Sequence, residues 1–132
     1  MPEIQTTDLP GYRKKSFLLY YNGGEIWFEH LEGMFGYEDL VLEKLYTDVP
    51  LFTKPSSTSF ICFVFFDTVV TDRIVLAVKK AVLESGKHFT GIAFCGLNRR
   101  TREKLKKALS DQGFRIAFCD GLEDAKAWLL PS

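Results

Sequence analysis

Cysteine is scarce in this sequence, and the three residues present follow no metal-binding pattern. Cys62, Cys95 and Cys119 each lie inside or at the end of an apolar run, and the chain has neither a CxxC pair nor a paired Cys/His spacing. Zinc sites depend on such spacings, so we expect no metal. A cysteine in an apolar run usually behaves as a small buried hydrophobe, because a redox role needs exposure. Neighbouring parallel strands would still bring the three thiols near one another.

The chain also lacks an excess of charge and a long hydrophobic segment. Lysine plus arginine number 17, as do aspartate plus glutamate, so no overall field favours nucleic acid or an anionic membrane. No apolar run approaches the roughly 20 residues that span a bilayer. The first residues lack the apolar core of a signal peptide. We therefore expect a cytoplasmic protein with neither a membrane nor a nucleic acid as partner.

Motifs for catalysis are missing as well. No serine or cysteine stands in a nucleophile elbow, the glycines form no phosphate-binding loop, and His30 and His88 have no partner at a catalytic spacing. Asp67 ends an apolar run, as the phosphorylated aspartate of a response regulator does. The first strand, however, lacks the acidic pair that would hold magnesium there. We expect no enzyme activity and no cofactor.

The first half of the chain predicts a lead-in, a hairpin and one helix. Residues 1–15 contain proline and glycine and predict an irregular segment before a single domain over 16–132. The Asn-Gly-Gly stretch at 22–24, between two aromatic runs, predicts a tight hairpin. Tyr37–Tyr46 has apolar residues at helical spacing. The two prolines within 49–59 predict a loop after this helix.

From residue 59 onward the pattern alternates between strands and helices. The runs SFICFVFF, FTGIAFC and FRIAFC are apolar enough to be buried on both faces, which is typical of parallel strands. Asn98 is a predicted N-cap for the helix over 99–112, and Asp120 for the last helix. With a further helix over Ile74–Ser85, the chain predicts an α/β fold with a mixed sheet of four to five strands and helices packed on it.

This order of elements, together with three loose motifs, resembles a STAS domain, the family named after sulfate transporters and anti-sigma factor antagonists. The motifs are EGMFGYEDL, the apolar strand that ends in Asp67, and the closing pair GIAFCGLNRRTREKLKKAL and FRIAFCDGLEDAKAWL. The resemblance covers roughly residues 15–130. It implies a non-enzymatic docking module in bacterial signalling or transcriptional regulation.

The resemblance also implies a partner and a control point. STAS domains of this kind bind an anti-sigma factor that is also a protein kinase, and phosphorylation of one Ser or Thr after the third strand breaks the complex. Thr71 matches that acceptor by position, although its aspartate follows it and the family's glycine is missing, so the motif is degenerate. The docking surface would be the exit of the third strand and the helix Ile74–Ser85, and the loop residues around Thr71 that belong to it are Asp67, Thr68, Asp72 and Arg73.

Two features keep alternative explanations open. The Thr71 hydroxyl is equally suited to cap the following helix, which stabilises by roughly 1 kcal/mol. The helix after Asn98 carries a basic face, which is either a solvated surface or a contact for an acidic partner or a phosphate-bearing ligand. A STAS-like domain that binds a small anionic or apolar ligand is therefore the alternative function. The aromatic hairpin either covers the sheet or forms a homodimer face. The basic face comprises Arg99, Arg100, Arg102, Lys104, Lys106 and Lys107.

Overall fold

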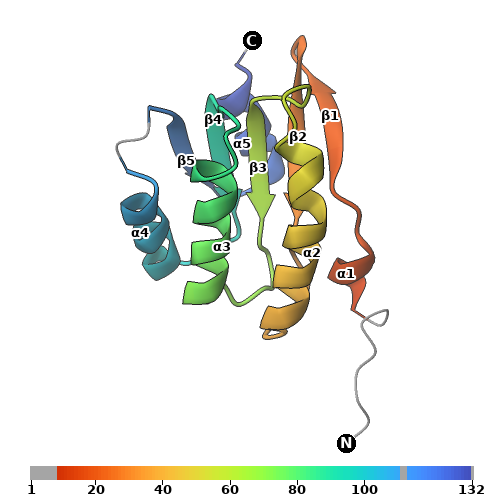
Figure 1. The fold of residues 1–132 in the computed structure, drawn as a ribbon, viewed down its shortest axis with the longest axis vertical. Helices are drawn as coiled ribbons and strands as arrows, with labels where there is room; N and C mark the ends of the chain where they lie inside the picture. The colour runs from red at the N-terminus through yellow and green to blue at the C-terminus, as the bar shows by residue number, and fades with distance from the viewer. Residues whose placement is uncertain (1–8, 111–112, 132) are drawn as a thin grey trace, which may run out of the picture.

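The computed structural model describes residues 9–110 and 113–131. They form a five-stranded sheet with helices on both faces, as Figure 1 shows, which confirms the predicted α/β fold. No helix in these two ranges has the length and apolar character to cross a membrane. The elements in chain order are α1 (Pro10–Arg13), β1 (Phe17–Tyr21), β2 (Gly24–His30), α2 (Glu38–Phe52), β3 (Phe60–Val64), α3 (Asp72–Leu83), β4 (Gly91–Cys95), α4 (Arg99–Ala108), β5 (Arg115–Cys119) and α5 (Leu122–Leu129).

The sheet follows the chain, with the strand order β1-β2-β3-β4-β5. β1 runs antiparallel to β2, and the other strands run parallel to one another. Asn22 and Gly23 both have positive φ, at 47° and 81°, which is the geometry of the predicted tight hairpin. Because β2 to β5 are parallel, their carboxyl ends and the loops that follow meet at one edge of the sheet.

The two faces of the sheet bury different layers. α2, α3 and α4 cover one face, and α5 crosses the other (Figure 1). Stacked phenylalanines run across the first face: the rings of Phe63 and Phe94 lie 5.3 Å apart and those of Phe94 and Phe118 lie 5.5 Å apart. The abundance of phenylalanine therefore serves the core, since each ring buries a large apolar surface between the sheet and the helices.

α2 is longer than the helix predicted over Tyr37–Tyr46, because it continues through Pro50 to Phe52. Proline removes one hydrogen bond from a helix and is costly in its interior. Here Pro50 lies in the last turn of α2. Phe52, two residues later in the same turn, is in the core with 1% of its surface exposed. The Phe52 ring lies 6.1 Å from Trp27 and 6.2 Å from Phe63. This burial offsets the cost of the proline, and the predicted loop was wrong at this point.

Four other boundaries differ from the sequence predictions, one of which is α3, which spans Asp72–Leu83 rather than Ile74–Ser85. Residues 10–13 of the supposedly irregular lead-in form α1, while 1–8 lie outside the described residues. α4 ends at Ala108 rather than 112, a position that is also outside them. Asp120 does not cap α5: the N-cap is Gly121, with no side-chain hydrogen bond. The Asp120 carboxylate is 94% exposed and lies 3.7 Å from Arg102 Nη2 instead. The cap at Asn98 is confirmed, since its side chain accepts from Thr101 N–H at 2.9 Å.

Candidate functional site

The loops after β2 and β3 are joined into a rigid corner at the carboxyl edge of the sheet. Phe35 N–H donates to the Asp67 carbonyl at 2.8 Å, and Val69 N–H donates to the Phe35 carbonyl at 2.8 Å. The Thr68 hydroxyl donates to Leu31 O at 2.7 Å and accepts from Met34 N–H at 3.1 Å. Backbone and side-chain hydrogen bonds therefore join the two loops directly to each other.

The same corner holds two residues in a strained backbone conformation. Phe35 and Asp67 have φ values of 47° and 53°, in the left-handed region that bulky residues rarely adopt. Such conformations persist only where surrounding contacts enforce them, and they cluster at binding sites and switch regions. Here the contacts are the hydrogen bonds between the two loops.

Three apolar side chains project from this corner into solvent. Phe35, Tyr37 and Val69 expose 54%, 38% and 59% of their surface. We call them the corner patch. Leu76 extends the apolar surface along the outer side of α3, where it is 50% exposed. Exposed apolar side chains held on a rigid backbone are what a docking surface presents to a partner.

Thr71 lies beside the corner patch and is the N-cap of α3. Its Oγ1 accepts from Ile74 N–H at 3.3 Å, which confirms the predicted cap. The hydroxyl also hydrogen-bonds to Glu38 at the start of α2, and this bond and the nearby Arg73 hold the pKa of the Glu38 carboxyl below its usual range. Arg73 Nη1 lies 2.6 Å from Glu38 Oε1 and 3.6 Å from Asp39 Oδ1. The starts of α2 and α3 are thus linked through Thr71, Glu38 and Arg73.

The remaining predicted site residues fall on the same side of the molecule but not all at the corner. Asp72 lies 2.5 Å from Lys104 Nζ, and this hydrogen bond lowers the pKa of the Asp72 carboxyl. That pair connects α3 to α4. On α4, Arg102 and Lys106 turn toward the Phe118 ring of β5, at 5.9 and 5.8 Å from its centre. The basic face therefore meets the residues around Thr71 through Lys104, while Arg102 and Lys106 face β5.

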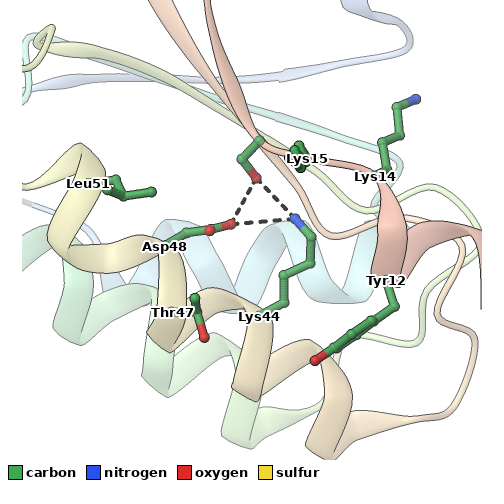
Figure 2. A pocket seen from close by; sticks show the side chains of 8 residues that line it. Tyr12, Lys14, Lys15, Lys44, Thr47, Asp48 and Leu51 are labelled. Atoms are coloured by element: carbon green, nitrogen blue, oxygen red, sulfur yellow. Dashed lines mark hydrogen bonds and ion pairs between the residues drawn. The ribbon is translucent and has the colours of Figure 1, made fainter. Parts of the chain in front are cut away.

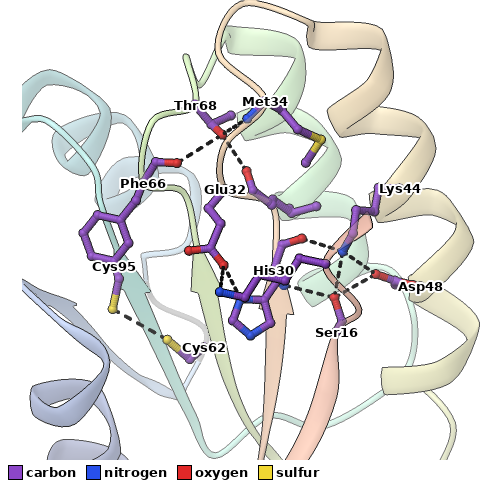
Figure 3. A network of polar contacts seen from close by, with 12 residues as sticks. Ser16, His30, Glu32, Met34, Lys44, Asp48, Cys62, Phe66, Thr68 and Cys95 are labelled. Atoms are coloured by element: carbon purple, nitrogen blue, oxygen red, sulfur yellow. Dashed lines mark hydrogen bonds and ion pairs between the residues drawn. The ribbon is translucent and has the colours of Figure 1, made fainter. Parts of the chain in front are cut away.

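Sequence reasoning missed a buried polar cluster between β2 and α2. Lys44 Nζ donates to His30 O at 2.5 Å and to Ser16 Oγ at 3.0 Å, and lies 3.4 Å from Asp48 Oδ2. The Ser16 hydroxyl donates to Asp48 at 2.9 Å and accepts from His30 N–H at 3.0 Å (Figure 3). Glu29 lies beside Asp48 with no exposed surface, and its Oε1 accepts from Trp27 Nε1 at 3.0 Å. Burial, followed by the contact with Asp48, raises the Glu29 pKa to about 9.

A hollow of about 330 Å³ opens beside this cluster (Figure 2). Lys44, Asp48 and the Ser16 hydroxyl meet one another there, as the dashed lines in the figure show. All three N–H groups of the Lys44 ammonium have acceptors, and the Ser16 hydroxyl is committed to Asp48. The hydrogen bonds of the cluster tie the start of β1 to α2 and β2.

The side chains of His30 and of the three cysteines are also buried in the fold. The His30 ring is buried between Phe17 and Phe28, with centroids at 5.3 and 6.1 Å, and this desolvation lowers its pKa. The sulfur atoms of Cys62 and Cys95 lie 3.7 Å apart, so the sheet does bring these two thiols together. All three cysteines are buried and free, as predicted. Among the described residues, no group of three or more His, Cys, Asp or Glu side chains is arranged to hold a metal ion.

Comparisons of the chain with protein-family models, with curated proteins and with solved structures found no match.

Proposed function

We propose that this chain is a non-enzymatic docking module of the STAS type, which binds a protein partner in bacterial signalling or transcriptional regulation. The docking surface is the corner patch with the exposed side of α3. The observation that carries this proposal is the exposure of Phe35 and Val69 on loops that are hydrogen-bonded to each other. Because the loops are already ordered, this chain loses little conformational entropy when a partner binds them.

The partner that the STAS resemblance suggests is an anti-sigma factor with protein-kinase activity. Its contact surface would match the corner patch with apolar side chains at the centre. A cationic rim would complement Asp67, which is exposed beside the patch, and Asp39 at the start of α2, which is 89% exposed. Charges at the rim of an interface mainly set the association rate and the choice of partner, and the buried apolar centre supplies most of the affinity.

Thr71 acts first as a helix cap in this proposal, and docking does not depend on its phosphorylation. A phosphate on Thr71 would add a charge of about −1.5 to −2 next to Glu38 and Asp72. Arg73, the nearest cation, already pairs with Glu38. A phosphate there would compete with Glu38 for Arg73 and separate the starts of α2 and α3, which would reshape the docking surface.

Titration calorimetry with an anti-sigma factor kinase from the same organism tests the proposal. We expect Val69→Asp to weaken binding at least tenfold, since it places a charge in the apolar centre. The matched control is Tyr20→Asp, because Tyr20 is the most exposed large hydrophobic residue of the described chain, at 78%, and lies in the hairpin away from the corner. Equal loss in both variants, or no binding by the unaltered chain to any such kinase, would refute the proposal. Phosphate mapping by mass spectrometry after incubation with ATP then reports whether Thr71 is modified.

A further inference from the structure

The outer edge of β5 presents unpaired backbone groups to solvent. β5 is the last strand of the sheet, and only β4 pairs with it among the described residues. Arg115 N–H donates to Thr90 O at 3.1 Å, so the backbone groups of Arg115 point inward to the sheet. Backbone direction alternates along a strand, and the N–H and C=O groups of Ile116 and Phe118 therefore point outward. A free edge of this kind is a template for one more strand.

A groove between α4 and β5 runs beside this edge. It has a volume of about 690 Å³ and is lined on one side by the half-buried side chains of Ile116 and Phe118. The same two residues thus offer outward backbone groups and side chains that face the groove. Figure 1 shows α4 and β5 together at one edge of the domain.

The wall of the groove on α4 is strongly cationic. Arg99, Arg102 and Lys106 line it, with Glu103 as the single acidic residue. The chain as a whole has no net charge, so these cations are a local concentration rather than part of a general positive field. Arg102 and Lys106 both lie over the Phe118 ring, at 5.9 and 5.8 Å from its centre. Arg102 also lies 3.7 Å from Asp120 and Lys106 lies 3.4 Å from Glu103, so an acidic ligand in the groove would compete with these two carboxylates for the cations.

The charge of the groove decides between the possible occupants of the edge. A second copy of this chain, paired through β5, would bring two cationic α4 helices to the same junction, where they repel each other. A nucleic acid or a small anion would neutralise the cations but leave the N–H and C=O groups of Ile116 and Phe118 unpaired. An extended acidic peptide satisfies both features, because its backbone pairs with the edge while its side chains meet the cations.

We propose that the β5 edge and the adjoining groove form a second docking site, which binds an extended acidic segment of a partner protein as a sixth strand of the sheet. Side chains alternate between the two faces of such a strand. Those on the α4 side face Arg99, Arg102 and Lys106 and are acidic. Those on the α5 side lie near Ala117 and are small or apolar. The site is on a different edge of the domain from the corner patch and does not depend on the function proposed for it.

The probe that tests this proposal is a fluorescein-labelled octapeptide of four Glu-Val repeats, titrated against the full chain by fluorescence anisotropy. We expect saturable binding that weakens with salt, and none by the matching Lys-Val peptide. The double variant Arg102→Glu/Lys106→Glu should bind the probe at least tenfold more weakly. Its matched control is Arg100→Glu/Lys107→Glu, which makes the same change of charge on the same helix at residues that do not line the groove.

The backbone pairing is tested separately, on the unaltered protein. A Glu-Val peptide that is N-methylated at alternate residues keeps its charge but loses the edge hydrogen bonds, and we expect at least a tenfold loss of affinity. Amide hydrogen exchange by NMR should slow at Ile116 and Phe118 when the probe binds, and should change little at Arg115. No binding of the probe, equal losses in the two double variants, or equal affinity for the N-methylated peptide would overturn the proposal. So would exchange at Ile116 and Phe118 that does not slow, or displacement of the probe by equimolar ATP.

Discussion

Glu29 gives a prediction whose size follows from its environment. The side chain has no exposed surface, and its burial, with Asp48 alongside, raises the pKa from an ordinary 4.5 to about 9. Glu29 is therefore protonated at neutral pH, with Asp48 alongside. Trp27 Nε1 donates to Glu29 Oε1 at 3.0 Å, and the other oxygen, Oε2, is buried with no hydrogen-bond partner among the described residues. Glutamine has the same shape, accepts from Trp27 and stays neutral without any need for a proton.

The sign of the effect follows from linkage. A carboxyl group whose pKa is higher in the folded than in the unfolded state stabilises the fold fully below about pH 4.5. That stabilisation falls by about 1.4 kcal/mol per pH unit above it and is lost at about pH 9. At pH 7, keeping Glu29 protonated costs about 3 kcal/mol relative to the unfolded chain. Glu29→Gln removes this cost, so we expect it to raise the free energy of unfolding by about 3 kcal/mol at pH 7 and by little at pH 4.5.

Urea unfolding followed by circular dichroism at pH 4.5, 5.5, 7 and 8.5 measures the difference. The matched control is Glu84→Gln, which makes the same chemical change at an exposed position after α3. The gap between the Glu29→Gln variant and the unaltered protein should widen with pH, while the control should show no such trend. A gap that stays constant, or a variant that is less stable at pH 7, would mean that Glu29 is ionised in the fold and paired with Lys44, and the reasoning would be wrong.

Three further predictions, with five substitutions between them, are tested by the same unfolding measurement. Thr71→Ala removes the cap of α3 and should cost about 1 kcal/mol, whereas Thr71→Ser should keep most of that stability. Gly96→Ala should lower the free energy of unfolding by well over 1 kcal/mol, because a Cβ there would lie 2.5 Å from Phe66 N. Gly113 has a similar positive φ but open space around it, so Gly113→Ala should lower it by only about 1 kcal/mol. Lys44→Met leaves the Asp48 carboxylate without its buried cation and should cost about 3–5 kcal/mol. A cost below 1 kcal/mol would show that water replaces the ammonium group.

Local pattern was enough to predict most of the fold. Parallel strands followed from apolar runs without polar alternation, and the caps at Thr71 and Asn98 followed from residue type before an apolar helix. The failures came where tertiary contacts decide. Pro50 signals a helix end, but the core contacts of Phe52 with β2 and β3 keep the helix intact. A local sequence pattern carries no information about those contacts, because they join residues far apart in the chain.

The candidate surfaces were predictable only in part. The position of Thr71 at a strand-to-helix junction followed from the sequence, but the exposure of Phe35 and Val69 did not, because large apolar residues are expected in the core. The buried cluster was missed for the opposite reason: charged residues are expected at the surface. One signal was present, since Lys44 and Asp48 are four residues apart on a helix whose apolar face includes Val41 and Leu45.

The buried cluster and the corner patch are connected through α2. A shift of α2 by one residue would turn the helix by about 100° and remove Lys44 and Asp48 from Ser16 and His30. The cluster therefore fixes the position of α2. Glu38, six residues before Lys44 and about 9 Å along the same helix, is thereby held against Thr71 and Arg73. A buried polar network thus places one side of the proposed docking surface.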